Sequence, residues 1–166
     1  MSRSMVLREC RWLCLLVWWS LLTGGFFSAG CRTGADASLF TAAGPGWRVQ
    51  QGQALWRPGR HYPELGGEVV VASHPDGRCA VQFVKTPIPM VLAQTSSTNW
   101  LIQFPPRHIG FAGKNNPPPR FLWLHLRAAL AGESLPGILY FSRKPDGGWK
   151  LENVKSGETV EGYLEP

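Results

Sequence analysis

Few side chains of this 166-residue chain have the types and the spacing that catalysis or metal binding requires. No histidine lies at metal-ligand spacing from a cysteine or a carboxylate pair, and the sequence has no nucleophile-elbow, phosphate-cradling or dinucleotide-binding motif. The four histidines are His61, His74, His108 and His125. Glu64 and Glu68 are four residues apart, but Gly66-Gly67 between them argues against a helix that would align their carboxylates. We therefore expect no enzymatic activity, no cofactor and no metal, with an active site assembled from distant residues as the open alternative.

The N-terminal residues have the organisation of a secretory signal peptide. Three arginines precede an apolar run over residues 12–22, and small residues follow up to Cys31. The apolar run is shorter than the roughly 20 residues that span a bilayer comfortably. We therefore predict a signal peptide over residues 1–30, with a retained membrane helix as the alternative.

The end of this signal resembles the lipobox of bacterial lipoproteins. Ala29 and Gly30 precede Cys31, and Ser28 occupies the position at which lipoproteins usually have leucine. The resemblance implies that Cys31 is acylated, becomes the mature N-terminus and binds membrane lipid. Several acyl chains on one residue anchor a protein far better than a single chain, whose attachment is marginal and reversible. Because an aspartate after the cysteine retains such lipoproteins in the inner membrane, Arg32 implies a bacterial outer-membrane location facing the periplasm.

The mature chain is long enough for one domain and carries a modest positive charge. Removal of residues 1–30 leaves 136 of 166 residues and lowers the net charge from +6 to +4, because three arginines and one glutamate leave. The basic residues are scattered, and only Arg143 and Lys144 are adjacent, so we expect no nucleic-acid partner. Cys79 is the one cysteine left besides Cys31, so no disulfide framework is expected, and its spacing predicts a buried core residue.

The pattern changes from a tether to a β domain at Trp47. Small and polar residues without periodicity precede it, so residues 31–46 are predicted to be the lipidated cysteine and a flexible tether. Alternating polar and apolar residues then predict strands separated by turns. The nine predicted strands cover residues 48–56, 68–72, 78–85, 90–95, 100–104, 108–112, 138–143, 149–154 and 158–164. The prolines of residues 86–89 cannot donate ladder hydrogen bonds, so a loop or sheet edge is expected there, within one β domain over residues 47–166.

One segment breaks the β pattern. Residues 120–131 are rich in leucine, alanine and arginine, follow three prolines and precede Gly132, which is the usual punctuation of a helix. The helix would be apolar almost all round, so we expect it to be buried on more than one side, against a curved sheet. The strands at 69–71, 100–102 and 138–141 are apolar on both faces, so the helix, a bound apolar ligand or both must cover the second face.

The strands, the single apolar helix and the lipid-anchored N-terminus resemble the LolA/LolB-like group of periplasmic lipoprotein carriers and outer-membrane receptors. Local likeness is greatest over residues 51–58, where a glycine-bearing strand ends in an aromatic residue, a base and a proline. The resemblance extends over residues 47–164 and implies a mainly β fold with one or two helices, a curved antiparallel β half-barrel closed by an apolar helix. It also implies binding of acyl chains or lipoproteins as cargo, in lipoprotein localisation and insertion. We expect a monomer, with a periplasmic carrier as a candidate partner.

A lipid-binding cavity would need large apolar side chains on a concave surface, because each acyl methylene removed from water contributes about 0.8 kcal/mol. The candidate cavity residues are Trp56, Phe83, Trp100, Ile102, Phe104, Phe111, Leu122, Trp123, Leu126, Tyr140 and Trp149. Each has the alternative role of an ordinary core residue, and only their collective excess favours a cavity. In LolB-like receptors the loop between the third and fourth strands presents an apolar residue to the membrane, and Ile88 and Met90 occupy that place here. Ile88 folding back over the sheet edge is the alternative.

Two other functions stay open. A non-transport envelope-assembly or scaffolding lipoprotein would share the anchor and the fold, but its own side chains would fill the cavity. A lipid-processing enzyme would need convergent polar groups, which the sequence does not signal. The acidic side chains of the last meander are instead predicted to solvate its outer face. These are Glu152, Glu158, Glu161 and Glu165.

Overall fold

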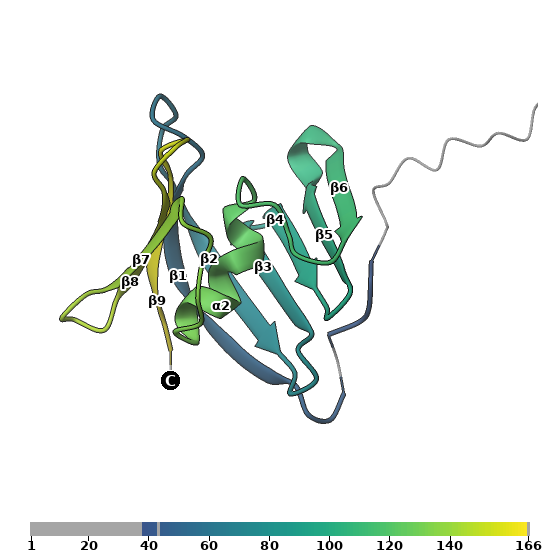
Figure 1. Cartoon of the computed structure of the whole chain (residues 1–166). Coiled ribbons are helices and arrows are strands. Elements are labelled where there is room, and N and C mark those ends of the chain that lie inside the picture. Colours follow the sequence, from purple (N-terminus) through teal and green to yellow (C-terminus); the bar gives the residue numbers. More distant parts are fainter. Residues whose placement is uncertain (1–37, 43, 166) are drawn as a thin grey trace, which may run out of the picture. The chain divides into compact units, whose positions relative to one another are not determined.

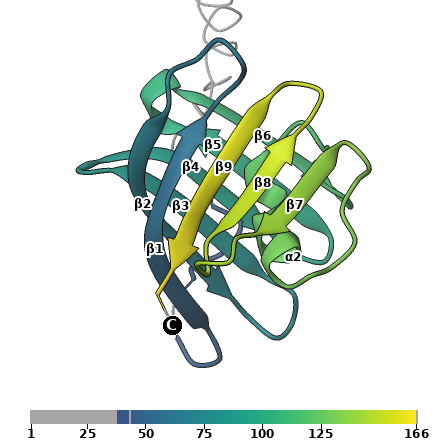
Figure 2. The same ribbon diagram turned by 90° about the vertical axis from the view of Figure 1, so that its left-hand side faces the viewer.

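The computed structural model describes residues 38–42 and 44–165, so the predicted signal peptide and Cys31 lie outside the described residues. The described part contains a nine-stranded antiparallel sheet that is curved and not closed (Figures 1 and 2). A short helical segment lies on the concave side of this sheet (Figure 1). The prediction of a mainly β fold, a curved half-barrel covered by a helix, is confirmed.

The strands form two meanders that meet in the middle of the sheet. The strand bounds are β1 (Arg48–Arg57), β2 (Leu65–Ser73), β3 (Cys79–Lys85), β4 (Ile88–Thr95), β5 (Asn99–Phe104), β6 (Ile109–Lys114), β7 (Leu139–Arg143), β8 (Trp149–Asn153) and β9 (Glu158–Leu164). Their order across the sheet is β6-β5-β4-β3-β2-β1-β9-β8-β7. The first strand therefore pairs with the last, and β6 and β7 form the two edges (Figure 2). A 3₁₀ turn, η1 (Pro105–Arg107), connects β5 to β6.

Glycine-bearing turns close two of the hairpins as the sequence predicts. Gly77 between β2 and β3 has a φ of 91°, and Gly147 between β7 and β8 has a φ of 85°. In both turns an aspartate precedes the glycine, and its side chain accepts a backbone hydrogen bond within the turn. Only glycine adopts such positive φ angles without a steric penalty, so these dipeptides fix where the strands reverse.

The connection between β3 and β4 is tighter than predicted. Strand β4 begins at Ile88, so the turn consists of Thr86 and Pro87 alone. Pro89 is accommodated because β4 pairs with β5 only from Leu92 onward, so the beginning of β4 has β3 as its single neighbour. The register shifts there, and the strand bulges.

The helical segment is shorter than predicted. A 3₁₀ turn, η2 (Leu122–His125), leads into the α-helix α2 (Leu126–Leu130), where the sequence predicts one helix over residues 120–131. Phe121 has a ψ of 79°, which lies outside the helical region, and its N–H donates to the carbonyl of Pro118 in a separate turn. The helix therefore begins only after this turn.

The core lies between the concave face of the sheet and the η2–α2 segment. In β1, Ala54 and Trp56 are buried in this core, whereas the alternate residues Gln53 and Leu55 are exposed on the outer face. Similar alternation runs through β3 and β8. Leu101 of β5 is buried although it belongs to the outer face, so this face also has covered apolar positions.

Part of the segment predicted as a tether contacts the outer face. The Leu39 N–H donates to Oε1 of Gln94 over 2.7 Å, and Nε2 of Gln94 donates to the Phe40 carbonyl over 2.9 Å. The Phe40 ring stacks on Trp47 with centroids 5.5 Å apart, and the Arg78 guanidinium lies over both rings. Residues 38–40 are thus held against β4 by hydrogen bonds and ring contacts, which the sequence does not predict.

Candidate functional site

Four aromatic rings meet on the concave face beneath the helical segment, and we call them the aromatic cluster: Trp56, Phe83, Phe104 and Trp123. The Trp123 ring lies 5.2 Å from Phe83 and 5.8 Å from Trp56, centroid to centroid. Trp56 in turn lies 5.9 Å from Phe83 and 6.3 Å from Phe104. Edge-to-face and offset pairs at these separations stabilise beyond the area they bury. The cluster therefore joins β1, β3, β5 and η2.

A second group of rings lies beside the sheet edge. The Phe121 ring is 5.6 Å from Trp100 and 5.0 Å from Phe111. The Arg120 guanidinium lies 4.6 Å from the centre of the Phe121 ring, which is a cation–π distance. Phe111 is 40% exposed and therefore forms the solvent-facing border of the concave face at β6.

The structure brings all but one of the predicted cavity residues together on the concave side. Eight are buried: Trp56, Phe83, Trp100, Ile102, Leu122, Trp123, Leu126 and Trp149. Phe104 is half-buried against the core, and Phe111 is exposed at its border. Tyr140 is 63% exposed and lies on the outer face, because it alternates with Leu139 and Phe141, which face the core. Lipid binding by these residues stays a prediction, since in this conformation their rings pack against one another.

Glu158 is buried in the core, contrary to the prediction that it solvates the outer face. It is 9% exposed, and its Oε1 accepts a hydrogen bond from Trp56 Nε1 over 3.0 Å. Burial raises the pKa of this carboxyl from 4.5 to about 7, and the Trp56 hydrogen bond opposes the shift. Glu158 is in phase with Val160 on β9, so strand alternation was the signal that could have found it.

Two indole N–H groups of the core have no hydrogen-bond partner among the described residues. They are Nε1 of Trp123 and Nε1 of Trp149, and both side chains are almost completely buried. A buried donor without an acceptor costs about 1–3 kcal/mol, so most proteins avoid it. The concave face therefore contains two donors that an acceptor group of a ligand could satisfy.

The other titratable groups of the core do not form a reactive arrangement. Cys79 is buried as predicted, and burial raises the pKa of its thiol to about 12, which keeps it in the unreactive protonated form. The ring of His125 is buried within η2, and burial lowers its pKa; its Nε2 lies 3.4 Å from the Pro118 carbonyl oxygen.

The connection between β3 and β4 lies where the sequence predicts it, but Ile88 and Met90 belong to β4 and not to the loop. Ile88 follows the β3–β4 turn and is 53% exposed, so its side chain is available for contact with another surface. Met90 is half-buried and packs against the core, where the β-bulge of β4 begins. Of the two predicted membrane-contact residues, only Ile88 is therefore presented to the outside.

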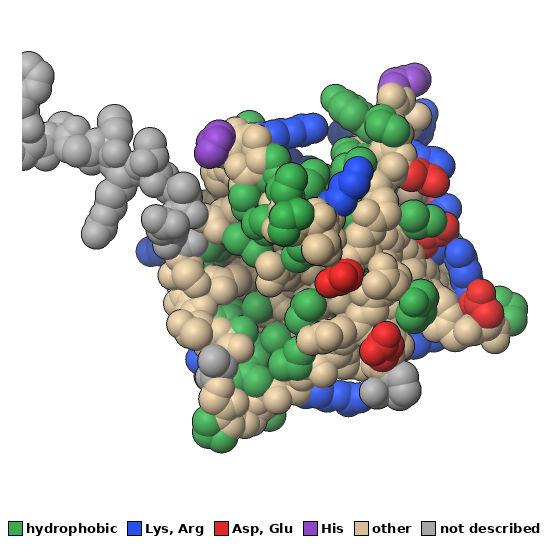
Figure 3. Space-filling model, turned by 180° about the vertical axis from the view of Figure 1, so that it is seen from behind, with side chains coloured by type: hydrophobic (Ala, Val, Ile, Leu, Met, Phe, Trp, Pro, Cys, Tyr) green, Lys and Arg blue, Asp and Glu red, His purple; other side chains and the backbone are tan. Residues whose placement is uncertain are grey.

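An apolar groove crosses the outer face of β2 to β5. Its cavity volume is about 450 Å³, and the N-terminal residues Ser38 and Ala42 form one of its walls. Val70, Leu92 and Leu101 contribute apolar surface to it. Figure 3 shows this side of the molecule, where hydrophobic side chains gather on the left half of the view. The groove is partly covered by the chain itself.

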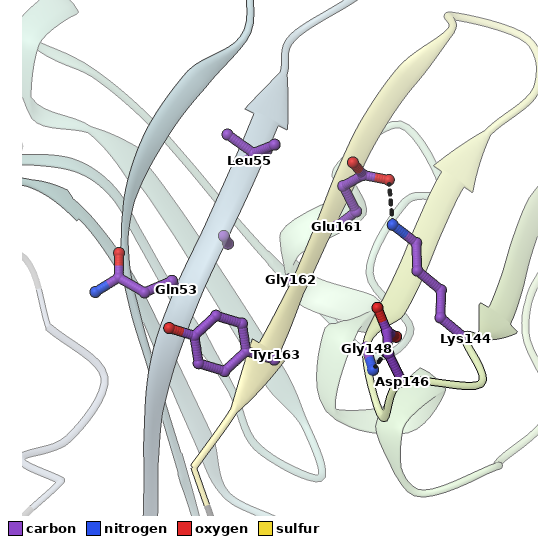
Figure 4. A pocket seen from close by; sticks show the side chains of 9 residues that line it. Gln53, Leu55, Lys144, Asp146, Gly148, Glu161, Gly162 and Tyr163 are labelled. Carbon is purple, nitrogen blue, oxygen red and sulfur yellow. Dashed lines mark hydrogen bonds and ion pairs between the residues drawn. The ribbon is translucent and has the colours of Figure 1, made fainter.

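A smaller cavity of about 310 Å³ lies where the β7–β8 turn approaches β1 and β9 (Figure 4). Lys144 of the turn pairs with Glu161 of β9 over 3.1 Å, and Asp146 accepts the Gly148 N–H over 3.0 Å. Its charged groups are therefore already occupied by contacts that hold the turn.

A third cavity, of about 480 Å³, opens on the concave side between the beginning of β1, the end of β2 and α2. Its charged lining consists of Arg48, Arg127 and Arg143, with His74 beside them. The sequence does not reveal this group, because its members are separated by up to 95 residues and only the fold brings them together.

Among residues 38–42 and 44–165, no three His, Cys, Asp or Glu side chains come close enough to hold a metal ion. Within the same residues, no helix has the length and apolar character needed to cross a membrane. Comparison with known proteins gave no family: no protein-family model matches the chain, and no curated protein matches it either.

Proposed function

We propose that this chain is a bacterial outer-membrane lipoprotein, anchored through acylated Cys31, whose half-barrel binds acyl chains or lipoproteins during their localisation. The observation that supports this proposal most is the aromatic cluster beneath a helical segment of four and five residues, η2 and α2. A concave apolar surface holds an acyl chain by removing its methylenes from water, with no catalytic group needed. A short covering segment is the element that can move to admit the acyl chain.

Binding requires the η2–α2 segment, which includes Trp123 of the aromatic cluster, to move away from the sheet. Leu122, Trp123 and Leu126 occupy the space next to the sheet, and all three are almost completely buried. Exposing three such side chains costs about 5–9 kcal/mol, and about 6–11 acyl methylenes at about 0.8 kcal/mol each offset that cost. A long acyl chain can therefore replace the segment, whereas a short one cannot.

The polar groups of the concave face fit an esterified ligand. The Nε1 donors of Trp123 and Trp149 have no acceptor among the described residues, and an ester carbonyl is an acceptor. A hydrogen bond there would remove the cost of a buried unpaired donor. This supports an acyl ester of a lipid or lipoprotein over a pure hydrocarbon.

A scaffolding lipoprotein without a ligand is the second candidate, and one observation favours it. None of the eleven predicted cavity residues lines the three cavities described above. The aromatic rings instead occupy the concave face themselves. If the η2–α2 segment never moves, the same fold is a rigid envelope module.

Site-specific photo-crosslinking in the envelope of the cells that export the protein separates these candidates. A photoreactive phenylalanine analogue replaces Phe111, which is exposed at the border of the concave face. The matched control replaces Tyr140, which is exposed on the outer face. A receptor should give adducts with lipoproteins or lipids from position 111 and few from position 140.

Native mass spectrometry of the full-length chain, released from detergent micelles, is the second measurement. A receptor retains acyl ligands of long chain length and not those of fewer than about six carbons, as the displacement cost requires. Equal crosslinking at both positions, together with no retained ligand, would reject the receptor and leave the scaffold.

A further inference from the structure

Three arginines from three separate elements line one cavity of the half-barrel. Arg48 of β1, Arg127 of α2 and Arg143 of β7 contribute to its walls, and we call this cavity the basal basin. Figure 2 shows α2 beside β7, and the Arg143 side chain donates to the Leu130 carbonyl over 2.7 Å, which ties the two elements together. The basin is thus a composite of distant segments held in place by the fold.

The positive charge of the basin is incompletely balanced. No aspartate or glutamate belongs to its lining. Arg127 pairs with Glu133 over 3.1 Å, but neither Arg48 nor Arg143 has an acidic partner among the described residues. Asp76 contacts His74, a lining residue of the basin, over 2.8 Å, and it is also paired with Arg78 over 2.7 Å. Two guanidinium groups therefore carry charge that an anion can complement.

Part of the lining of the basin is apolar. Val71 and Leu130 belong to its lining, and both pack in or against the hydrophobic core. Arginines beside apolar side chains in one cavity match a ligand that has an anionic head and a hydrocarbon part. Guanidinium groups recognise phosphate by pairs of parallel hydrogen bonds, so several of them suit the multiple oxygens of a phosphate better than a single carboxylate.

We infer that the basal basin binds a phosphate group, from an anionic lipid headgroup or from free phosphate. The arginines hold the phosphate oxygens, and the acyl part of a lipid lies along Val71 and Leu130 toward the core. This inference rests on the proposed function only for the acyl part, because the arginines would bind the phosphate of any source. If the phosphate belongs to a lipid, the ligand class of the half-barrel is anionic phospholipid.

Titration calorimetry of the full-length chain in dodecyl maltoside micelles tests the inference. The probes are dimyristoylphosphatidylglycerol, the zwitterionic dimyristoylphosphatidylcholine and inorganic phosphate. Arg48→Gln is the principal variant, because Arg48 is exposed and the change leaves the core intact. Arg127→Gln is the second variant, and Arg107→Gln, in η1 and outside the basin, is the control of equal charge change.

The expected result is that Arg48→Gln and Arg127→Gln each weaken the binding of phosphatidylglycerol about tenfold, while Arg107→Gln leaves it unchanged. Stronger binding of phosphatidylglycerol than of phosphate identifies the lipid as the source, and equal binding identifies free phosphate; both support the anion site. Binding of both lipids with no effect of the arginine variants would overturn the anion site and leave acyl binding intact. Arginine-dependent binding of phosphate alone would support the site and count against the acyl part.

Discussion

The indole Nε1 of Trp56 donates a hydrogen bond to the carboxyl of Glu158 over 3.0 Å, from β1 to β9 and across 102 positions of the sequence. Both side chains are buried, so this polar contact lies inside the core, next to the aromatic cluster. The protonated carboxyl suits this environment, and the carboxylate does not. The pair therefore makes the stability of the half-barrel depend on pH.

Replacing Glu158 with glutamine should remove that dependence. Because the pKa of Glu158 is raised from 4.5 to about 7 in the folded chain, the stabilisation that this group contributes is fully present below pH 4.5 and is lost as the pH rises to about 7. The free energy of unfolding should fall by about 3 kcal/mol over that range in the wild type through this group. Glu158→Gln keeps the acceptor for Trp56 and should be less sensitive to pH by that amount.

Urea unfolding followed by tryptophan fluorescence at pH 4.5 and pH 8 measures this difference. Glu165→Gln, an exposed carboxyl just beyond β9, is the matched control and should retain the wild-type pH dependence. An unchanged pH dependence in Glu158→Gln would show that the carboxyl is not the titrating group.

Replacing Trp123 with alanine should destabilise the domain strongly. Its ring contacts both Trp56 and Phe83 and is 1% exposed, so its removal leaves a large gap in the aromatic cluster. We expect a loss of about 3–5 kcal/mol in the free energy of unfolding. Tyr140→Ala removes an exposed ring of the outer face and should change this quantity by less than about 0.5 kcal/mol. Similar losses in both variants, in thermal or urea unfolding, would contradict the central position of Trp123.

Ile88 should matter for contact with a membrane. A chain of residues 32–166 lacks both the predicted signal peptide and the predicted lipid anchor, so its binding to phospholipid vesicles reports the remaining contacts. In this background Ile88→Asp should weaken vesicle binding about tenfold, because one exposed apolar side chain no longer leaves water. Val49→Asp changes a residue of similar exposure on the outer face of β1 and should have little effect. Unchanged binding by Ile88→Asp in a sedimentation assay would remove this role.

A methyl group on Gly52 should strain the pairing of β1 with β9. A Cβ at this position would overlap the backbone carbonyl of Tyr163, and backbone cannot move aside as a flexible side chain can. We expect Gly52→Ala to lower the free energy of unfolding by about 1–3 kcal/mol. Gly137→Ala, where the added Cβ meets open space, should be within about 0.5 kcal/mol of the wild type. Equal unfolding midpoints for the two variants would show that β1 and β9 accommodate the added methyl group without loss of stability.

Local sequence patterns predict most of the strand positions but little of the candidate functional site. Alternation and turn residues place nine strands close to their observed bounds, because each depends on neighbours a few residues away. The helix is shorter than its composition suggests, since the turn at Phe121 delays it. The prediction that Glu158 is exposed is wrong because a glutamate in a meander is usually exposed, whereas here its hydrogen-bond partner Trp56 comes from a strand 102 positions away. The basal basin depends on three segments whose proximity no local pattern encodes.

The pairing of the first strand with the last has a consequence for how the half-barrel assembles. β1 to β6 can form by successive hairpins, and so can β7 to β9, but the two sets share a ladder only through residues 52–57 and 159–164. Contacts between sequence-distant segments form slowly, because a long loop must first close. A chain truncated before β9 would leave β1 as a bare edge and β7 and β8 as a lone hairpin, which is marginal in water. Completion of the curved sheet thus requires β9, whichever hairpins have formed before it.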